Sequence, residues 1–122
     1  MPNAGLTKLT KKISHSVRDD LVYLVFFMGN YFIYIVTNPA KEVLYIGMTN
    51  DLYTRMVQHY DNRGNPKTFA GKYFCYNLIY FERHGSPSAA IEREKEIKKW
   101  SRAKKLKLIQ SANPTLKFLK DY

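Results

Sequence analysis

Residues 30–48, with the sequence NYFIYIVTNPAKEVLYIGM, decide the fold of this chain. Two runs rich in β-branched and aromatic residues, 30–37 and 43–48, flank the turn-rich segment NPAKE. Runs of this kind separated by a short turn predict a β-hairpin. Because the connection is short, we expect the two strands to pair antiparallel.

Side chains alternate between the two faces of each predicted strand. Tyr34 lies on one face of the first strand, and Tyr45 and Gly47 share a face of the second. The hairpin can therefore bring both tyrosines onto one face of the sheet. For either tyrosine alone, the simpler interpretation is an amphipathic sheet residue. Gly47, at the end of its strand, permits the close approach of another backbone or of a ligand.

The segment after the hairpin predicts a helix, a loop and a third strand. The polar residues at 49–51 are N-cap candidates for a helix that runs to about Tyr60. Residues 61–71, DNRGNPKTFAG, carry the Gly, Pro and Asn residues typical of a loop. Residues 73–82 are again rich in aromatic and apolar residues and predict the third strand.

Two helices are expected in the rest of the chain. Ser86 is a good N-cap and Pro87 a good first helical residue, so a helix should run from there to near Trp100. A Lys-rich helix follows at about 102–111, and Pro114 lies beyond its end. The order β-β-α-β-α-α predicts an α+β fold in which helices flank a small three-stranded antiparallel sheet.

One domain is expected at residues 28–115, with a C-terminal tail at 116–122 and a peripheral N-terminal extension at 1–27. The apolar stretch at 21–37 is interrupted by Gly29 and Asn30. Its apolar part is shorter than the ~20 residues of a spanning helix, so we expect no membrane span. It also lacks a small-residue cleavage site, which argues against a signal peptide.

The charge of the chain points to a polyanionic partner. There are 20 Lys and Arg residues against 10 Asp and Glu residues, a formal net charge of +10. Such a balance favours nucleic acid, although a charged, solubilising helix surface is the competing interpretation. Cys75, the single cysteine, fits a reducing, cytoplasmic compartment, and its apolar neighbours make it a core residue rather than a nucleophile.

Three side chains beyond the hairpin are candidates for chemistry. Arg55 and His59 are four residues apart and share a helix face. Arg55 could bind a phosphate and His59 could accept or donate a proton, or the two could form a solvated polar surface. Glu94 shares a stripe with Ala90 and Ile97, so it should face inward, unlike Glu residues 92 and 96. An inward carboxylate requires an ion pair or a metal ion, and Mg²⁺ would suit it.

Basic residues are concentrated at 93–107, REKEIKKWSRAKKLK. This run predicts a phosphate-binding surface or, alternatively, a solvated helix pair. At the entry to the third strand, a lysine and a tyrosine are further candidates for substrate contacts, with strand-edge polarity as the alternative. The candidate nucleic-acid-binding residues are thus Lys72, Tyr73, Lys98, Lys99, Arg102, Lys104 and Lys105.

Taken together, these residues resemble the GIY-YIG nuclease family. The two family triplets match residues 32–34, Phe-Ile-Tyr, and 45–47, Tyr-Ile-Gly, with ten residues between them. The first Gly of the family name is Phe32 here. The family's Arg, His and Glu match Arg55, His59 and Glu94, and its late Asn matches Asn113. The chain looks most similar to small bacterial single-domain members, relatives of the incision domain of the excinuclease that repairs damaged DNA.

The resemblance implies a metal-dependent endonuclease that hydrolyses phosphodiester bonds in nucleic acid, with a role in DNA repair or recombination. DNA is favoured over RNA as the substrate, and the sequence leaves both open, as it does duplex, branched or damaged forms. Glu94 would hold one divalent ion, Mg²⁺ or Mn²⁺. Tyr34 would position or deprotonate the attacking water and relay the proton to His59. Arg55 would neutralise charge on the phosphate, Tyr45 would orient the water or a phosphate oxygen, and Asn113 would brace the region of Glu94.

Two other functions compete with the nuclease. The scaffold could bind nucleic acid without cutting it, either because it is inactive or because it depends on a protein partner. It could also serve as a structural protein that uses its basic helices, in which case its affinity for nucleic acid would not depend on salt. An inward-facing glutamate argues for the enzyme, because a pure binder needs positive charge but no such carboxylate.

Overall fold

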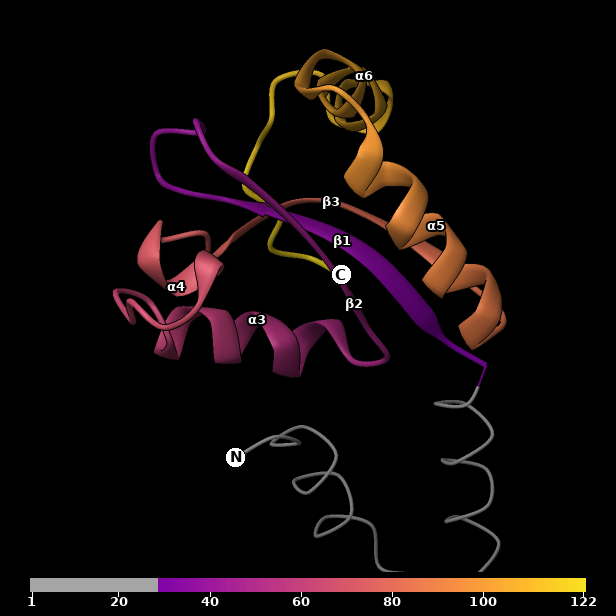
Figure 1. The fold of residues 1–122 in the computed structure, drawn as a ribbon, viewed down its shortest axis with the longest axis horizontal. Coiled ribbons are helices and arrows are strands. Elements are labelled where there is room, and N and C mark those ends of the chain that lie inside the picture. The colour runs from indigo at the N-terminus through magenta and orange to yellow at the C-terminus, as the bar shows by residue number, and fades with distance from the viewer. Residues whose placement is uncertain (1–28) are drawn as a thin grey trace, which may run out of the picture.

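The computed structural model describes residues 29–122, so the expected extension at 1–27 lies outside the described residues. Three antiparallel strands form one sheet of order β2-β1-β3 (Figure 1). The order β-β-α-α-β-α-α contains every predicted element and one additional short helix, and the α+β class is confirmed. The strands are β1 (Tyr31–Thr37), β2 (Leu44–Thr49) and β3 (Asn77–His84).

The turn of the predicted hairpin is held by one asparagine. The side chain of Asn38 accepts hydrogen bonds from the backbone N–H groups of Glu42 (2.7 Å) and Val43 (2.9 Å). Lys41 takes a left-handed conformation with φ 59°, which closes the turn. The resulting register places Tyr34 opposite Gly47 and Val36 opposite Tyr45. Because a slip by one residue would reverse both faces of β2, this turn sets which side chains meet.

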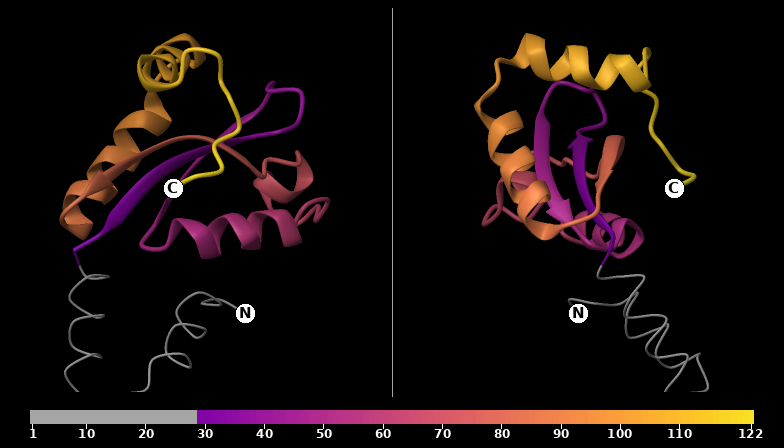
Figure 2. Two further views of the ribbon diagram at one scale, coloured as in Figure 1. Left: turned by 180° about the vertical axis from the view of Figure 1, so that it is seen from behind. Right: turned by 90° about the vertical axis from the view of Figure 1, so that its right-hand side faces the viewer.

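The sheet lies between two layers of helices (Figures 1 and 2). On one face, Ile33 and Ile35 of β1 pack with Ile97 and Ile109 from the two C-terminal helices. On the other face, Tyr34 and Val36 pack in a second cluster with the two helices that follow β2. The four helices are α3 (Leu52–Asp61), α4 (Phe69–Lys72), α5 (Pro87–Lys99) and α6 (Arg102–Ala112). Within residues 29–122, no helix has the length and apolarity required to cross a membrane.

Helix starts follow the sequence signals. Asp51 caps α3 by accepting a hydrogen bond from the backbone N–H of Thr54, and Ser86 caps α5 in the same way through Ala89. Pro87 is the first residue of α5, where its missing N–H has no intrahelical partner to lose. These caps confirm the predicted starts of both helices and fix where the functional side chains fall on them.

The prediction for residues 61–82 was wrong in two places. The expected loop at 61–71 contains the beginning of α4, and β3 begins at Asn77 instead of residue 73. Phe74 has a positive φ of 58°, and the backbone N–H of Cys75 donates to the carbonyl of Ala70 at 2.9 Å. The chain therefore turns back on α4 before β3 starts. Cys75 is buried at this turn, as expected of a core residue.

The C-terminal segment is attached to β3. The side-chain amide of Asn113 donates to the carbonyls of Ile79 (2.8 Å) and Lys117 (2.9 Å), and its oxygen accepts from the backbone N–H of Lys117 (3.0 Å). Further along, the backbone N–H of Leu119 donates to the carbonyl of Leu78 at 2.8 Å. We expected Asn113 to brace the region of Glu94, but these bonds make it the anchor of the C-terminal segment.

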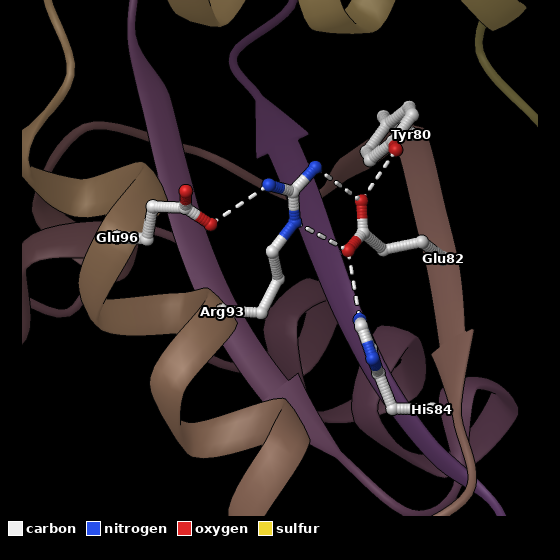
Figure 3. A network of polar contacts seen from close by, with 5 residues as sticks. All are labelled: Tyr80, Glu82, His84, Arg93 and Glu96. Atoms are coloured by element: carbon white, nitrogen blue, oxygen red, sulfur yellow. Dashed lines mark hydrogen bonds and ion pairs between the residues drawn. The ribbon is translucent and has the colours of Figure 1, made fainter.

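A network of charged side chains joins α5 to β3 (Figure 3). The guanidinium of Arg93 donates to both carboxylate oxygens of Glu82, at 2.7 and 3.3 Å, and to Glu96 at 2.9 Å. Glu82 also accepts a hydrogen bond from Tyr80 (2.6 Å) and pairs with His84 (2.8 Å). Burial alone would raise the pKa of Glu82, but the bonds from Arg93, Tyr80 and His84 outweigh it and lower that pKa.

We predict that Glu82→Gln lowers the free energy of unfolding at neutral pH by about 1–3 kcal/mol, the range for a hydrogen-bonded charged group that is partly buried. The folded-state pKa of Glu82 lies below its ordinary value of 4.5. Its stabilisation is therefore complete above that value and is lost as pH falls through the lowered folded pKa. Urea unfolding at a series of pH values should show a smaller acid-induced loss in the variant.

Glu96→Gln is the matched control, because Glu96 also pairs with Arg93 but its side chain is 54% exposed. An exposed i,i+3 pair contributes about 0–1 kcal/mol, so this variant should stay close to wild type. Equal losses in the two variants would show that Glu82 has no special part in joining α5 to β3.

Candidate active site

Tyr34 and Gly47 form a close contact at the centre of the hairpin. Tyr34 is completely buried on the β1 face that packs against α3. A Cβ atom added at Gly47 would overlap the hydroxyl oxygen and the ring of Tyr34. The phenol thus lies across the position that a side chain at residue 47 would occupy. We expected Gly47 to admit a backbone or a ligand, and the group that it admits is the phenol of Tyr34.

The hydroxyl of Tyr34 meets two side chains of α3. His59 Nε2 lies 2.8 Å from it, and Arg55 Nη1 lies 3.4 Å from it. Arg55 is held in place by two further bonds, from Nη1 to the carbonyl of Met48 (3.2 Å) and from Nε to Gln58 Oε1 (3.1 Å). The structure therefore brings together three of the predicted catalytic residues.

Tyr34 and His59 are both uncharged at pH 7, beside the positively charged Arg55. Burial raises the pKa of Tyr34 to about 12, although the hydrogen bond from Arg55 opposes the shift. Burial, followed by the positive charge of Arg55, lowers the pKa of His59 to about 4. Arg55 can only donate, so the phenol oxygen accepts from it. Nε2 of His59 accepts the phenol hydrogen in the neutral tautomer that carries its ring hydrogen on Nδ1. These bonds form a chain along which a proton can move from Tyr34 to His59.

Tyr45 completes the aromatic wall of the site. Its ring centroid lies 5.6 Å from that of His59 and 6.5 Å from that of Tyr34. The predicted placement of both tyrosines on one face of the sheet is therefore confirmed. Tyr45 also stacks on Phe69 of α4, with centroids 6.1 Å apart. Sequence reasoning missed Phe69, because it lies in a segment expected to be a loop. A single aromatic residue within that polar segment was the signal that could have identified it.

Glu94 lies on α5, in the helix layer that covers the opposite face of the sheet. Ala90 and Ile97 of α5 are completely buried and the Glu94 side chain is 22% exposed, whereas Glu92 is exposed, which confirms the predicted stripe. Burial is the main cause of the raised pKa of Tyr34, and the negative charge of Glu94 is the smallest of the influences that raise it. Its ion-pair partner is Lys98, at 3.2 Å.

Glu94 suits a hydrated divalent ion. Among residues 29–122, no three His, Cys, Asp or Glu side chains gather closely enough to enclose a metal ion. An ion held by Glu94 would take its other ligands from water and from phosphate oxygens. Mg²⁺ is commonly bound in this way, through one or two carboxylates together with substrate phosphates. The donor set of the site therefore fits such an ion.

The predicted nucleic-acid-binding residues fall on two faces of the sheet. Lys72 and Tyr73 are exposed at the end of α4, on the same side as Tyr45. The others belong to the α5–α6 layer, which covers the opposite face (Figure 2). Of these, Lys99, Arg102 and Lys104 are exposed, Lys105 is partly buried, Lys98 pairs with Glu94, and Lys104 lies 4.4 Å from the centre of the Trp100 ring.

Comparison with known proteins identifies a matching family. A family model described as the GIY-YIG catalytic domain matches residues 30–107, a range that contains the Tyr, Arg, His and Glu side chains above and excludes Asn113. UPF0213 proteins of Staphylococcus aureus strains Mu3, Mu50 and COL are each 36% identical over 83 residues, which cover 68% of this chain and 98% of each relative. No solved structure matches the chain.

We predict that Gly47→Ala destabilises the protein by about 1–3 kcal/mol, because the added methyl group would displace the buried phenol. Urea unfolding of a double-mutant cycle with Tyr34→Ala tests the cause. With the phenol removed, the methyl group has room, and Gly47→Ala should cost much less. An equal cost in both backgrounds would show that the glycine is required for another reason.

We also predict that the imidazole of His59 stays neutral from pH 7 down to about pH 5, and NMR titration of its ring nuclei would measure this. Its folded pKa of about 4 lies below the ordinary value of 6.5, so the unfolded chain binds the proton first. The contribution of His59 to stability is therefore lost as pH falls from 6.5 towards 4. Arg55→Gln should raise the pKa of His59; an unchanged pKa would exclude the influence of Arg55.

Proposed function

This chain belongs to the GIY-YIG family, a family of nucleases, and on that premise we propose that it is an endonuclease that hydrolyses phosphodiester bonds in DNA with one divalent metal ion, Mg²⁺ or Mn²⁺. The observation that carries the proposal is the hydrogen-bonded chain from Arg55 through Tyr34 to His59. A phenol bonded to a neutral imidazole suits proton transfer, which binding alone does not require.

In the proposed reaction, substrate binding opens the buried phenol of Tyr34 to the attacking water, which Tyr34 then positions. The water loses a proton to the phenol oxygen while the phenol hydrogen passes to Nε2 of His59. The water oxygen forms the new bond to phosphorus, and the bond to the leaving oxygen breaks; that oxygen then takes a proton from solvent. When bound at Glu94, a divalent ion would polarise the scissile phosphate and stabilise the leaving oxygen.

The substrate itself would improve His59 as a proton acceptor. Arg55 lowers the pKa of His59 in the free protein. A phosphate bound to Arg55 would neutralise that charge and would place negative charge near the imidazole, so the pKa of His59 would rise. Arg55 would thus both stabilise charge on the phosphate and couple substrate binding to the proton transfer. Tyr45 would orient the water or a phosphate oxygen.

The charge of the chain supports nucleic acid as the substrate. Exposed basic residues on both helix layers would contact phosphates, among them Lys72 and Arg102. Lys98 would release Glu94 to the metal ion and contact a phosphate instead. We further propose a role in DNA repair or recombination within the cytoplasm, on the strength of the resemblance to excinuclease incision domains and of the single, buried Cys75.

The second candidate is a nucleic-acid-binding module that does not cut, or that cuts only with a protein partner. One observation favours it: the ion pair between Lys98 and Glu94 occupies the carboxylate that a metal ion would need. The two functions differ in a single measurable property, the metal-dependent loss of intact substrate.

We predict that the wild type cuts DNA with Mg²⁺ or Mn²⁺ and that cutting stops with a chelator. Labelled single-stranded, duplex and branched DNA and RNA should be tested side by side. Arg55→Ala should lower turnover by about 10²-fold or more, since it removes charge stabilisation at the phosphate. Glu94→Ala should abolish metal-dependent cutting for lack of its carboxylate ligand.

Glu92→Ala is the matched control, because Glu92 lies on the same helix but is exposed on another face. It should retain the wild-type rate. Cutting by Glu94→Ala at the wild-type rate would remove Glu94 from the mechanism. Binding by every variant with no cutting by the wild type would identify the protein as a binding module.

A further inference from the structure

Helix α4 and the turn after it expose three large rings beside the candidate active site. Phe69 is 51% exposed, Tyr73 41% and Phe74 48%. Single apolar residues on a surface are ordinary, but neighbouring exposed rings on one short segment often mark an interaction site. The hydrolysis mechanism above makes no use of these rings.

Two of these rings, Phe69 and Tyr73, form a row of ring contacts with Tyr45 of the candidate site. Phe69 stacks on Tyr45 at an interplanar angle of 26°. Tyr73 lies against Phe69, with ring centroids 4.9 Å apart. The ammonium of Lys72 lies 5.3 Å from the centre of the Tyr73 ring. We call Phe69 and Tyr73 the aromatic platform; it leads from Tyr45, which touches His59, to the surface of the protein.

Hydrogen bonds hold the backbone of the segment that carries the platform. Thr68 caps α4 and accepts a hydrogen bond from the side chain of Asn62 at 2.8 Å, and Asn65 in turn donates to Asn62 at 2.9 Å. A Cβ atom at Gly71 would lie 2.7 Å from the carbonyl oxygens of residues 62 and 65, so the chain packs tightly there. The rings are therefore exposed on a segment whose backbone is fixed. Binding to a preorganised surface costs less conformational entropy.

The chemistry of the platform fits a nucleobase. Flat aromatic rings offer a stacking surface to any base, and an adjacent lysine can contact the phosphate of the same strand. In a duplex, each base already stacks on its neighbours, so its faces are not available to a protein ring. A base can reach the platform only where the strand is unpaired or where the base has left the stack.

We propose that Phe69 and Tyr73 form a stacking subsite for an unpaired base next to the phosphate in the active site, with Lys72 on the adjoining phosphate. This proposal rests on the proposed function and makes it more specific. The substrate is a strand that is unpaired at the site of cutting, as in single strands, flaps and forks. Stacking on the platform holds the strand so that its phosphate faces Arg55 and Glu94.

The test measures binding without cutting. Fluorescence anisotropy in the presence of a chelator gives the affinity of the full chain for a labelled single strand and for the duplex of the same sequence. Loss of one stacking contact is worth about tenfold in affinity. Phe69→Ala and Tyr73→Ala should each weaken single-strand binding by about that factor and leave duplex binding within about twofold.

Matched variants separate stacking from general effects. Phe69→Trp keeps a ring and should retain single-strand affinity, whereas Phe69→Leu keeps apolar contact with Tyr45 but loses the ring and should behave like Phe69→Ala. Tyr53→Ala removes a ring that is 60% exposed on α3, outside the platform, and should bind as wild type does. Equal affinities in the Leu variant and the wild type would overturn the stacking subsite.

Abasic strands test the base directly. A series of single strands, each lacking one base, should contain one position at which affinity falls about tenfold for wild type but not for Phe69→Ala. Additive losses at every position would overturn the proposal, as would equal weakening of single-strand and duplex binding in the platform variants.

Cutting assays distinguish this proposal from the proposed function. If the wild type never cuts, yet its single-strand affinity depends on Phe69 and Tyr73, hydrolysis fails and the stacking subsite stands. If the wild type cuts with a metal ion and both platform variants bind and cut as it does, the nuclease stands and the stacking subsite fails.

Discussion

The close packing of the Tyr34 phenol over Gly47 is the constraint on which the rest of the site depends. The register of the hairpin puts the two residues opposite each other, and the absence of a side chain at residue 47 lets the phenol lie across the edge strand. From there the hydroxyl reaches His59 and Arg55 of α3. A shift of register by one residue would separate all of these groups at once.

The three-stranded sheet also separates the two helix layers that carry the candidate site residues. α3 supplies the arginine and histidine from one face, and α5 supplies Glu94 from the other. The negative charge of Glu94 adds a small contribution to the raised pKa of Tyr34, whose main cause is burial. Arg93, next to Glu94 on α5, binds Glu82 on β3 and so fixes the rotation of the helix (Figure 3). Neighbouring residues on a helix point about 100° apart, so that bond also sets the direction of Glu94.

Local patterns in the sequence were enough to predict the hairpin, the caps at Ser86 and near Asp51, and the stripe that turns Glu94 inward. They failed at residues 69–76, because the apolar residues that make a turn around α4 have the composition of a strand. The bond between Arg93 and Glu82, and the anchoring of Asn113 on β3, join residues distant in the chain. No periodicity or spacing indicates such a partner, so only the folded structure identifies it.

The attachment of the C-terminal segment has a consequence for the solubility of the protein. β3 forms one edge of the sheet, and an exposed edge strand offers its backbone to another molecule for pairing. Here the chain's own Leu119 donates to the carbonyl of Leu78, while Asn113 holds the segment in place. The C-terminal segment thus covers that end of the β3 edge and keeps it from pairing with another molecule. The segment follows residue 107, where the match to the family ends.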